Sequence, residues 1–296
     1  MLDLYALDRY NNIMKKKQVI TRFAPSPTGK LHKGHAYSVR LAYEYAKEHG
    51  GLFILRIEDI DTTRCKPEFT ELIYKDLKWL GINWQEPVRI QSEHFDDYKK
   101  ALDVIKELGL VYPCFCTRKE IREEIERSPK APHGPEGAHY PGTCKHLTKA
   151  EISSLMESGR DHAWRLNVDN AIKYAKSIQK WPLTWFDTCD DQHIANPASL
   201  GDVVLARKDT PTSYHLSVTV DDAKQGITHV IRGTDLLHST HIHVILQALL
   251  DLPTPIYHHH KLIVDADGNR FAKRNKSATL ENLRINGVDP CSLFLK

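Results

Sequence analysis

The chain has 296 residues, of which 41% are hydrophobic and 27% are charged, and its formal net charge is +3. These values are typical of a soluble globular protein, and the charge neither requires nor excludes a nucleic-acid partner, because a local basic groove can exist within a near-neutral total. No apolar run approaches the roughly 20 residues of a membrane helix, and the polar N-terminus has no signal-peptide pattern, so we expect a cytoplasmic protein without a membrane partner.

The first third of the chain alternates predicted strands and helices. Apolar runs at 19–24 and 52–57 predict buried strands, and amphipathic runs at 36–49, 68–80 and 96–108 predict helices. This order predicts an α/β fold with a parallel sheet and right-handed crossovers. Ligands bind to such sheets at the carboxyl ends of the strands.

The next part, residues 113–197, has a different character. Cysteine, proline, glycine and histidine concentrate between 113 and 146, a charged helix is predicted near 118–127, and 162–189 is predicted as short strands with turns. We interpret this part as an insertion with its own small core.

Alternation then resumes in the last third. The sequence predicts a strand at 228–232, a helix at 241–250 and a strand or extended segment at 257–264. We therefore expect one α/β domain that is split into 19–112 and 198–285, with the insertion between the two halves.

The first chemical motif covers residues 22–35 and reads Arg-Phe-Ala-Pro-Ser-Pro-Thr-Gly-Lys-Leu-His-Lys-Gly-His. Its prolines end the first strand, and His32 and His35 begin the following helix on one face. Free N–H groups and the macrodipole at a helix N-terminus favour a phosphate, and Gly34 lets a ligand approach the backbone. For the His-x-x-His spacing alone, an ordinary turn with two surface histidines is the alternative.

Charged side chains also follow other predicted strands. Glu58, in the string Arg-Ile-Glu-Asp-Ile-Asp, ends a buried strand and can bind an ammonium group, although a solvated acidic loop is the alternative. Tyr214 and Arg232 can clamp a carboxylate, which a guanidinium binds with two parallel hydrogen bonds, although such pairs are more often structural. Residues 269–276, Asn-Arg-Phe-Ala-Lys-Arg-Asn-Lys, form a basic loop that by itself indicates a solvated turn.

Three cysteines cluster in the insertion, namely Cys114, Cys116 and Cys144. Cys65, Cys189 and Cys291 stand alone, so the six do not form a disulfide framework. A structural zinc ion needs four ligands, and by chemistry alone the fourth is a histidine: His146, His139 or His133. Three reduced cysteines without metal are the alternative.

A histidine triplet occupies residues 258–260. Adjacent residues of a strand point to opposite faces, so we expect the three imidazoles not to converge on one ion.

Taken in order, these strings resemble the class I glutamyl-tRNA synthetases. The first is similar to the signature centred on His-Ile-Gly-His, with Lys33 in place of Ile, and the others are similar to Arg-Ile-Glu-Asp-Thr-Asp, Tyr-x-Leu-x-x-x-Val-Asp-Asp, Ile-Arg-Gly and the Lys-Met-Ser-Lys loop. The resemblance covers nearly all of residues 19–285. It implies a Rossmann-like class I synthetase catalytic domain with a parallel sheet and an inserted zinc-containing subdomain.

The resemblance also implies site residues. His32 and His35 would stabilise charge on the α-phosphate of ATP, with Gly34 beside them, and Lys273 would act on the departing pyrophosphate. In the lysine loop, Arg270 keeps the charge of the usual first lysine, whereas Ala272 lacks the serine hydroxyl. The glutamate-binding positions are Arg22, Ser26, Glu58, Tyr214 and Arg232. The family pattern Cys-x-Cys and Tyr-x-x-x-Cys implies a structural zinc ion on Cys114, Cys116, Tyr140 and Cys144, with the histidines as rivals of the tyrosine.

Only a short segment follows the lysine loop, and with Ile60 and the cysteine pattern it makes the chain similar to the glutamyl-queuosine tRNA(Asp) synthetases. That resemblance implies tRNA-independent formation of glutamyl-adenylate from L-glutamate and ATP with magnesium. Glutamate would then pass to queuosine in the anticodon loop of tRNA(Asp). We expect a monomer without an anticodon-binding domain. The alternatives are a glutamyl-tRNA synthetase that has lost that domain, and a non-catalytic, zinc-stapled RNA-binding paralogue.

Overall fold

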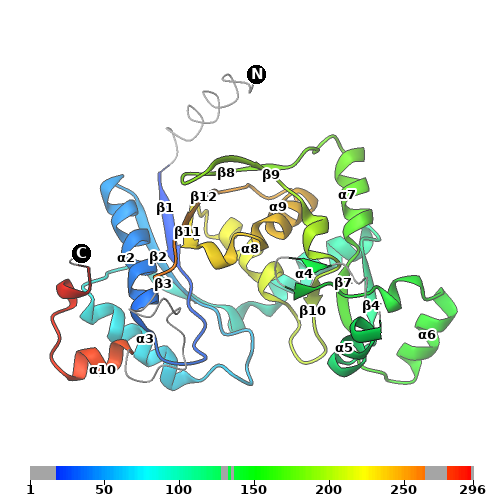
Figure 1. The fold of residues 1–296 in the computed structure, drawn as a ribbon, viewed down its shortest axis with the longest axis horizontal. Helices are drawn as coiled ribbons and strands as arrows, with labels where there is room; N and C mark the ends of the chain where they lie inside the picture. The colour runs from blue at the N-terminus through cyan, green and yellow to red at the C-terminus, as the bar shows by residue number, and fades with distance from the viewer. Residues whose placement is uncertain (1–17, 128–132, 135–136, 264–278, 295–296) are drawn as a thin grey trace.

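The computed structural model describes residues 18–127, 133–134, 137–263 and 279–294. Figure 1 shows its elements as a row of three parts: strands β1 to β3 with α2 and α3 at one end, β8, β9, β11 and β12 with α8 and α9 in the middle, and α5 and α6 at the other end. None of the helices in these ranges is long and apolar enough to span a membrane.

The N-terminal part is a parallel sheet in the order β1-β2-β3. Its strands are β1 (Ile20–Phe23), β2 (Leu52–Ile57) and β3 (Gln85–Ile90). The helices that follow them are α2 (Lys33–Glu48), α3 (Pro67–Trp79) and α4 (Phe95–Glu107). The strands and helices predicted for this part are all present. The third strand was not predicted, because its polar first half lacks an apolar run.

The middle part is a second sheet in the order β11-β12-β8-β9. Its strands are β11 (His229–Gly233), β12 (Ile256–His260), β8 (Thr184–Asp187) and β9 (Asp191–Ile194). The first three run parallel and β9 is antiparallel to β8. Helices α8 (Tyr214–Lys224) and α9 (Ser239–Leu249) belong to this part, and the strands and the helix predicted in the last third of the chain are confirmed.

The two sheets meet at β1 and β11. The Thr228 N–H donates to the Ile20 carbonyl at 3.0 Å, and the Ile20 N–H donates to Thr228 Oγ1 at 2.8 Å. From β1 the chain continues outward to β2, whereas from β11 it continues in the other direction to β12. A ligand crevice forms at such a switch point, outside the carboxyl ends of the strands. The fold therefore places the site between β1 and β11.

The third part is an antiparallel sheet in the order β10-β7-β4. Its strands are β4 (Val111–Cys114), β7 (Ala163–Leu166) and β10 (Val204–Ala206). The predicted charged helix is α5 (Arg118–Arg127), and α6 (Lys149–Glu157) and the short pair β5 (His133–Gly134) and β6 (Gly137–Ala138) also lie here.

The prediction of strands and turns alone for residues 162–189 is wrong, because α7 (Val168–Ser177) lies within this range. Asn167 caps the helix by accepting a hydrogen bond from the Asn170 N–H at 3.1 Å. Val168, Ala171 and Ala175 are buried at helical spacing. The amphipathic period of this segment is no weaker than that of the helices that were predicted, so the signal was present in the sequence and the prediction overlooked it.

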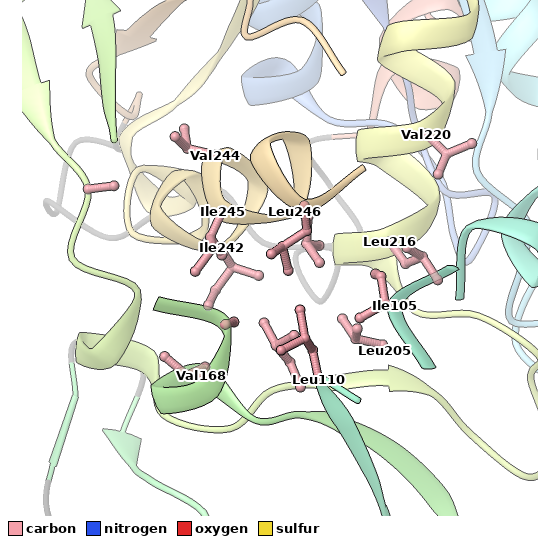
Figure 2. Packing of buried hydrophobic residues seen from close by; sticks show 14 of the residues in the cluster. Ile105, Leu110, Val168, Leu205, Leu216, Val220, Ile242, Val244, Ile245 and Leu246 are labelled. Atoms are coloured by element: carbon pink, nitrogen blue, oxygen red, sulfur yellow. The ribbon is translucent and has the colours of Figure 1, made fainter. Parts of the chain in front are cut away.

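The largest core joins the middle and third parts. Figure 2 shows Ile242, Ile245 and Leu246 of α9 facing side chains that include Leu110 and Val168 across a packed layer. The insertion therefore shares most of its core with α8 and α9, and the small core of its own that was expected accounts for the rest. Only a small cluster is separate, formed by Tyr112, Cys114, Phe115 and Cys144. The domain boundaries at 112 and 198 stay a prediction.

The last helix, α10 (Leu280–Ile285), returns to the N-terminal part. The Leu280 N–H donates to the Leu31 carbonyl at 2.9 Å, and Arg284 pairs with the buried Asp76 at 3.2 Å. The segment after the lysine loop is therefore packed against α3.

Candidate active site

A cavity of about 450 Å³ opens at the carboxyl ends of β1 and β11. Its lining includes eight residues predicted from the sequence: Arg22, Ser26, His32, Gly34, His35, Glu58, Tyr214 and Arg232. They come from three strand ends, the loop after β1 and the N-termini of α2 and α8. The structure thus gathers in one place side chains that are as much as two hundred positions apart.

His32 and His35 cap the N-terminus of α2, as predicted. Nδ1 of His32 accepts from the Gly34 N–H at 3.1 Å, and Nδ1 of His35 accepts from the His32 N–H at 3.2 Å. Their ring centroids are 3.8 Å apart. Because each Nδ1 is an acceptor, the proton of each neutral ring lies on Nε2. Two imidazole donors and a positive helix end therefore meet at one edge of the cavity, which suits a phosphate.

Gly34 is needed for this arrangement. A Cβ atom at this position would lie 3.0 Å from Cε1 and 3.1 Å from Nδ1 of His32, which is tighter than ordinary contact. The space that a side chain would fill is taken by the His32 ring. The glycine therefore keeps the ring close to the helix end.

Beneath the cavity lies a buried ionic cluster built around Asp222. Arg22 binds this carboxylate with Nε at 3.1 Å and a second nitrogen at 3.4 Å, and Arg56 binds it at 2.8 Å. Arg56 also lies 3.2 Å from Glu58. Although burial opposes ionisation, the two guanidinium groups hold the pKa of Asp222 below its usual range. The positive charge of Arg22 is thus largely compensated within the protein.

Glu58 is the acid of this cluster that reaches the cavity. Its side chain is 7% exposed, and burial raises its pKa to about 7, although Arg56 and Arg22 act in the opposite direction. A cationic group in the cavity would favour the ionised form. Glu58 is therefore a suitable partner for an ammonium group.

Arg232 contrasts with Arg22. It is buried, and its guanidinium donates to Tyr214 Oη at 3.3 Å, Thr240 Oγ1 at 2.6 Å and His259 Nε2 at 3.0 Å, all of them neutral groups. Among the described residues, no carboxylate forms an ion pair with it. A buried cation without an anion is costly, so this site is built to receive an anionic ligand.

The sequence motifs did not identify several residues that hold this site together. Asp222 and Arg56 are part of quoted strings, and a charged residue within an apolar strand or helix was the available signal. Asp187 gave no such signal, and His259 was marked only by the unusual histidine triplet. Within the triplet, His259 contacts Arg232, whereas His260 contacts Ser38 at 2.7 Å. The three imidazoles thus diverge, as expected from a strand.

Lys273, Arg270 and Ala272 lie outside the described residues. Both described flanks of their loop reach the cavity. Ile263 lines it, and Thr279 forms a β-bridge with His32. The described residues on either side of 264–278 therefore both lie at the cavity, and Thr279 lies beside His32.

Two smaller cavities continue from this one past Tyr214. The first, of about 150 Å³, shares Ser26, Glu58 and Tyr214 with the main cavity. The second, of about 350 Å³, shares Tyr214 and Arg207 with the first and is also lined by Arg165. Side chains of both charges line these two cavities, namely Arg64, Arg165 and Arg207 together with Glu58, Asp61 and Asp202.

The clustered cysteines form a separate candidate metal site. Sγ atoms of Cys114, Cys116 and Cys144 all lie within 4.8 Å of one another, and those of Cys116 and Cys144 are 3.4 Å apart. Tyr140 Oη lies 3.5 Å from Cys116 Sγ. Sulfur atoms at this separation fit around a zinc ion with bonds of about 2.3 Å.

The rival histidines are not part of this cluster as far as the structure describes them. His139 Nε2 contacts the Ser199 carbonyl at 2.8 Å, and His146 is exposed. The side chain of His133 lies outside the described residues. Tyr140 as fourth ligand stays a prediction.

Comparisons with known proteins agree with this geometry. The model of the family described as tRNA synthetases class I (E and Q), catalytic domain, matches residues 18–295. A glutamyl-Q tRNA(Asp) synthetase of Rhodobacter capsulatus is 45% identical over 93% of this chain and 98% of its own length. A glutamate–tRNA ligase of Aquifex aeolicus is 38% identical over 94% of this chain.

A glutamate-tRNA synthetase structure from Elizabethkingia anophelis superposes with a TM-score of 0.72 at 31% identity, over 87% of this chain. The chain spans 53% of that structure and 56% of the Aquifex ligase, about half the length of each. The match over 98% of the Rhodobacter protein is by contrast nearly complete at both ends. With its cavity, its switch point and these relatives, the chain belongs to the class I tRNA synthetase (E and Q) catalytic-domain family.

Proposed function

We propose that this protein is a glutamyl-queuosine tRNA(Asp) synthetase. It activates L-glutamate with ATP, without tRNA, and transfers the glutamate to queuosine in the anticodon loop of tRNA(Asp). The observation that carries the proposal is a single cavity with three complementary charges: the uncompensated Arg232, the acidic Glu58 and the helix end with His32 and His35. Glutamate and the phosphates of ATP carry charges opposite to these.

The amino acid occupies the part of the cavity near Glu58, Arg22, Ser26, Tyr214 and Arg232. Glu58 binds the α-ammonium group, and Arg232 with Tyr214 binds a carboxylate. Arg22 adds positive charge, weakened by its pairing with Asp222.

For activation, an oxygen of the α-carboxylate attacks the α-phosphorus of ATP, and the bond from that phosphorus to the bridging oxygen of pyrophosphate breaks. Nε2–H groups of His32 and His35 donate to the developing charge on the α-phosphate, which stabilises the transition state more than the bound substrate. Lys273 neutralises the leaving pyrophosphate. Magnesium accompanies ATP, without a dedicated protein site in this proposal.

Transfer follows when a nucleophile of the queuosine base attacks the activated carbonyl and AMP leaves. The two cavities beyond Tyr214 would receive the modified anticodon loop, whose phosphates Arg207 and Arg165 can meet. The name and the nearly equal length of the Rhodobacter relative support this acceptor.

A zinc ion on Cys114, Cys116, Tyr140 and Cys144 would connect β4 to the segment before α6 and take no part in the chemistry. We propose that it stabilises an inserted subdomain at 113–197, beside a catalytic domain at 19–112 and 198–285. Strands β8 and β9 lie within 113–197 but extend the sheet of β11 and β12. We also propose that the protein is a monomer and that it is located in the cytoplasm.

Glutamate–tRNA ligase relatives at 38% identity favour a second candidate, a synthetase that charges tRNA(Glu). The deciding experiment incubates the protein with ATP, radiolabelled glutamate and, in parallel, queuosine-containing tRNA(Asp), unmodified tRNA(Asp) and tRNA(Glu). Label on modified tRNA(Asp) alone is the expected result. Label on tRNA(Glu) would favour the second candidate, and no label together with no ATP–pyrophosphate exchange would point to a non-catalytic paralogue.

A further inference from the structure

We infer that Asp187 and His259 form a positioning dyad for Arg232, which fixes the guanidinium in the orientation that binds the amino-acid carboxylate. This inference rests on the proposed function, because it assumes that Arg232 receives glutamate. The dyad lies below the cavity and touches neither substrate, so its members act through Arg232 alone.

The three side chains form a continuous chain of hydrogen bonds. Asp187 Oδ2 lies 2.5 Å from His259 Nδ1, and His259 Nε2 accepts from Arg232 Nε at 3.0 Å. The side chains of Asp187 and His259 are both 1% exposed. Oδ1 of the aspartate accepts from the backbone N–H of Cys189 at 2.9 Å and, more weakly, from that of His259 at 3.4 Å.

The sheet itself aligns these three hydrogen-bonded side chains. Asp187 ends β8, His259 lies on β12 and Arg232 lies on β11, and these are neighbouring strands (Figure 1). Arg232 and His259 are register partners on β11 and β12, and Asp187 of β8 pairs with Tyr257 of β12. The dyad is therefore built on rigid parallel strands, which is the kind of support that precise positioning needs.

Donor and acceptor chemistry allows only one tautomer of His259. A guanidinium has no acceptor, so Nε2 must offer its lone pair to Arg232. The proton then lies on Nδ1, where the Asp187 carboxylate accepts it. Burial lowers the pKa of His259 to about 4, and the charge of Arg232 acts in the same direction, so the ring is neutral as this arrangement requires.

The dyad explains how Arg232 stays both fixed and available. A carboxylate in direct contact would hold the guanidinium but would also compete with the substrate for its charge. The interposed neutral ring keeps Asp187 out of direct contact while fixing Nε of Arg232. Outer partners of this kind commonly change affinity or activity by about 10- to 100-fold when they are altered.

The test is Asp187→Asn. The amide oxygen can still accept from the backbone N–H of Cys189, which places the amide NH₂ against His259 Nδ1. That nitrogen must then accept, the ring proton moves to Nε2, and Nε2–H faces the Arg232 Nε–H. Two opposed donors displace the guanidinium.

In ATP–pyrophosphate exchange we expect the glutamate KM of Asp187→Asn to rise by about 10- to 100-fold, with the ATP KM and the melting temperature close to those of the parent. Asp191→Asn, an exposed carboxylate in the same β8–β9 hairpin, is the matched control and should change neither KM. His259→Asn can keep the contact to Asp187 but has no atom at the Nε2 position, so it should raise the glutamate KM as well.

Imidazole nitrogen NMR of the wild-type protein, with the His259 signal assigned from the His259→Asn spectrum, should give the Nδ1–H tautomer. The Nε2–H tautomer in the wild type would overturn the inference, even if Asp187→Asn failed to fold. An unchanged glutamate KM in a folded Asp187→Asn variant would overturn it too. Failure of the proposed function is a separate result, namely a wild-type protein without glutamate-dependent exchange, and there the tautomer measurement still decides on the dyad.

Discussion

The buried carboxylate of Glu58 should lower the free energy of unfolding while it provides the partner for the α-ammonium group of the substrate. The variant Glu58→Gln tests both effects. Burial raises its pKa from the ordinary 4.5 to about 7, so ionisation is harder in the folded than in the unfolded chain. Between these two values the folded protein holds the extra proton, and its stability therefore falls as pH rises. The difference between 4.5 and about 7 corresponds to about 3 kcal/mol well above pH 7.

Glutamine is a neutral isostere and avoids this cost. We expect Glu58→Gln to raise the free energy of unfolding by up to about 3 kcal/mol at pH 8, and by about 1 kcal/mol or less at pH 5, where the wild-type carboxyl is mostly protonated. Urea denaturation at the two pH values measures this. The same variant should lose glutamate-dependent pyrophosphate exchange, because the amide cannot pair with the α-ammonium group.

The pH dependence is what decides. Glu93→Gln, at an exposed position, is the matched control and should change stability little at either pH. A gain from Glu58→Gln that is equal at pH 5 and pH 8 would mean that the amide merely packs better. No increase in the free energy of unfolding at pH 8 would refute the claim that burial makes the ionised Glu58 costly. Retained glutamate activation would refute the role of Glu58 in binding.

Three further outcomes are expected. Cys144→Ser should release zinc and lower the melting temperature, whereas the solitary, exposed Cys291→Ser should do neither; unchanged metal content by elemental analysis would contradict the ligand assignment. Gly34→Ala should displace the His32 ring and lower kcat by about tenfold, while glutamate binding measured by calorimetry stays the same; an unaffected kcat would argue against the need for a glycine. Lys273→Ala should reduce adenylate formation far more than glutamate binding, and equal losses in both would remove its assigned role in pyrophosphate departure.

The sequence predicted much of the fold because its signals are local. The strands before Pro25 and before Glu58 are apolar runs, and the helix after His32 has a clear amphipathic period. In β3 the prediction failed because the strand lacks an apolar run, whereas α7 has a clear amphipathic period that was overlooked. The shared core of the insertion was not predictable either, since it depends on which apolar faces meet in three dimensions.

The residues that line the cavity could also be predicted, because each stands in a string at a strand end or a helix start. Their supporting partners could not. Asp187 and His259 are 72 positions apart, and Arg22 and Asp222 are 200 apart. No local pattern states that such residues will touch, so only the folded chain reveals which charges are compensated and which are available.

That difference separates the two arginines of the site, which are equivalent as sequence signals. Arg22 shares a carboxylate with Arg56 and is largely neutralised, whereas the partners of Arg232 within the described part of the chain are all neutral, including the His259 ring. Under the proposed function, substrate charge is therefore met mainly on the β11 side, whereas Arg22 on β1 and Arg56 on β2 chiefly hold the cluster of Asp222 and Glu58. If the proposed function holds and Arg232 binds the side-chain carboxylate of glutamate, an amino acid with a neutral side chain would leave the charge of Arg232 uncompensated, which is a physical reason for the site to prefer an acidic substrate.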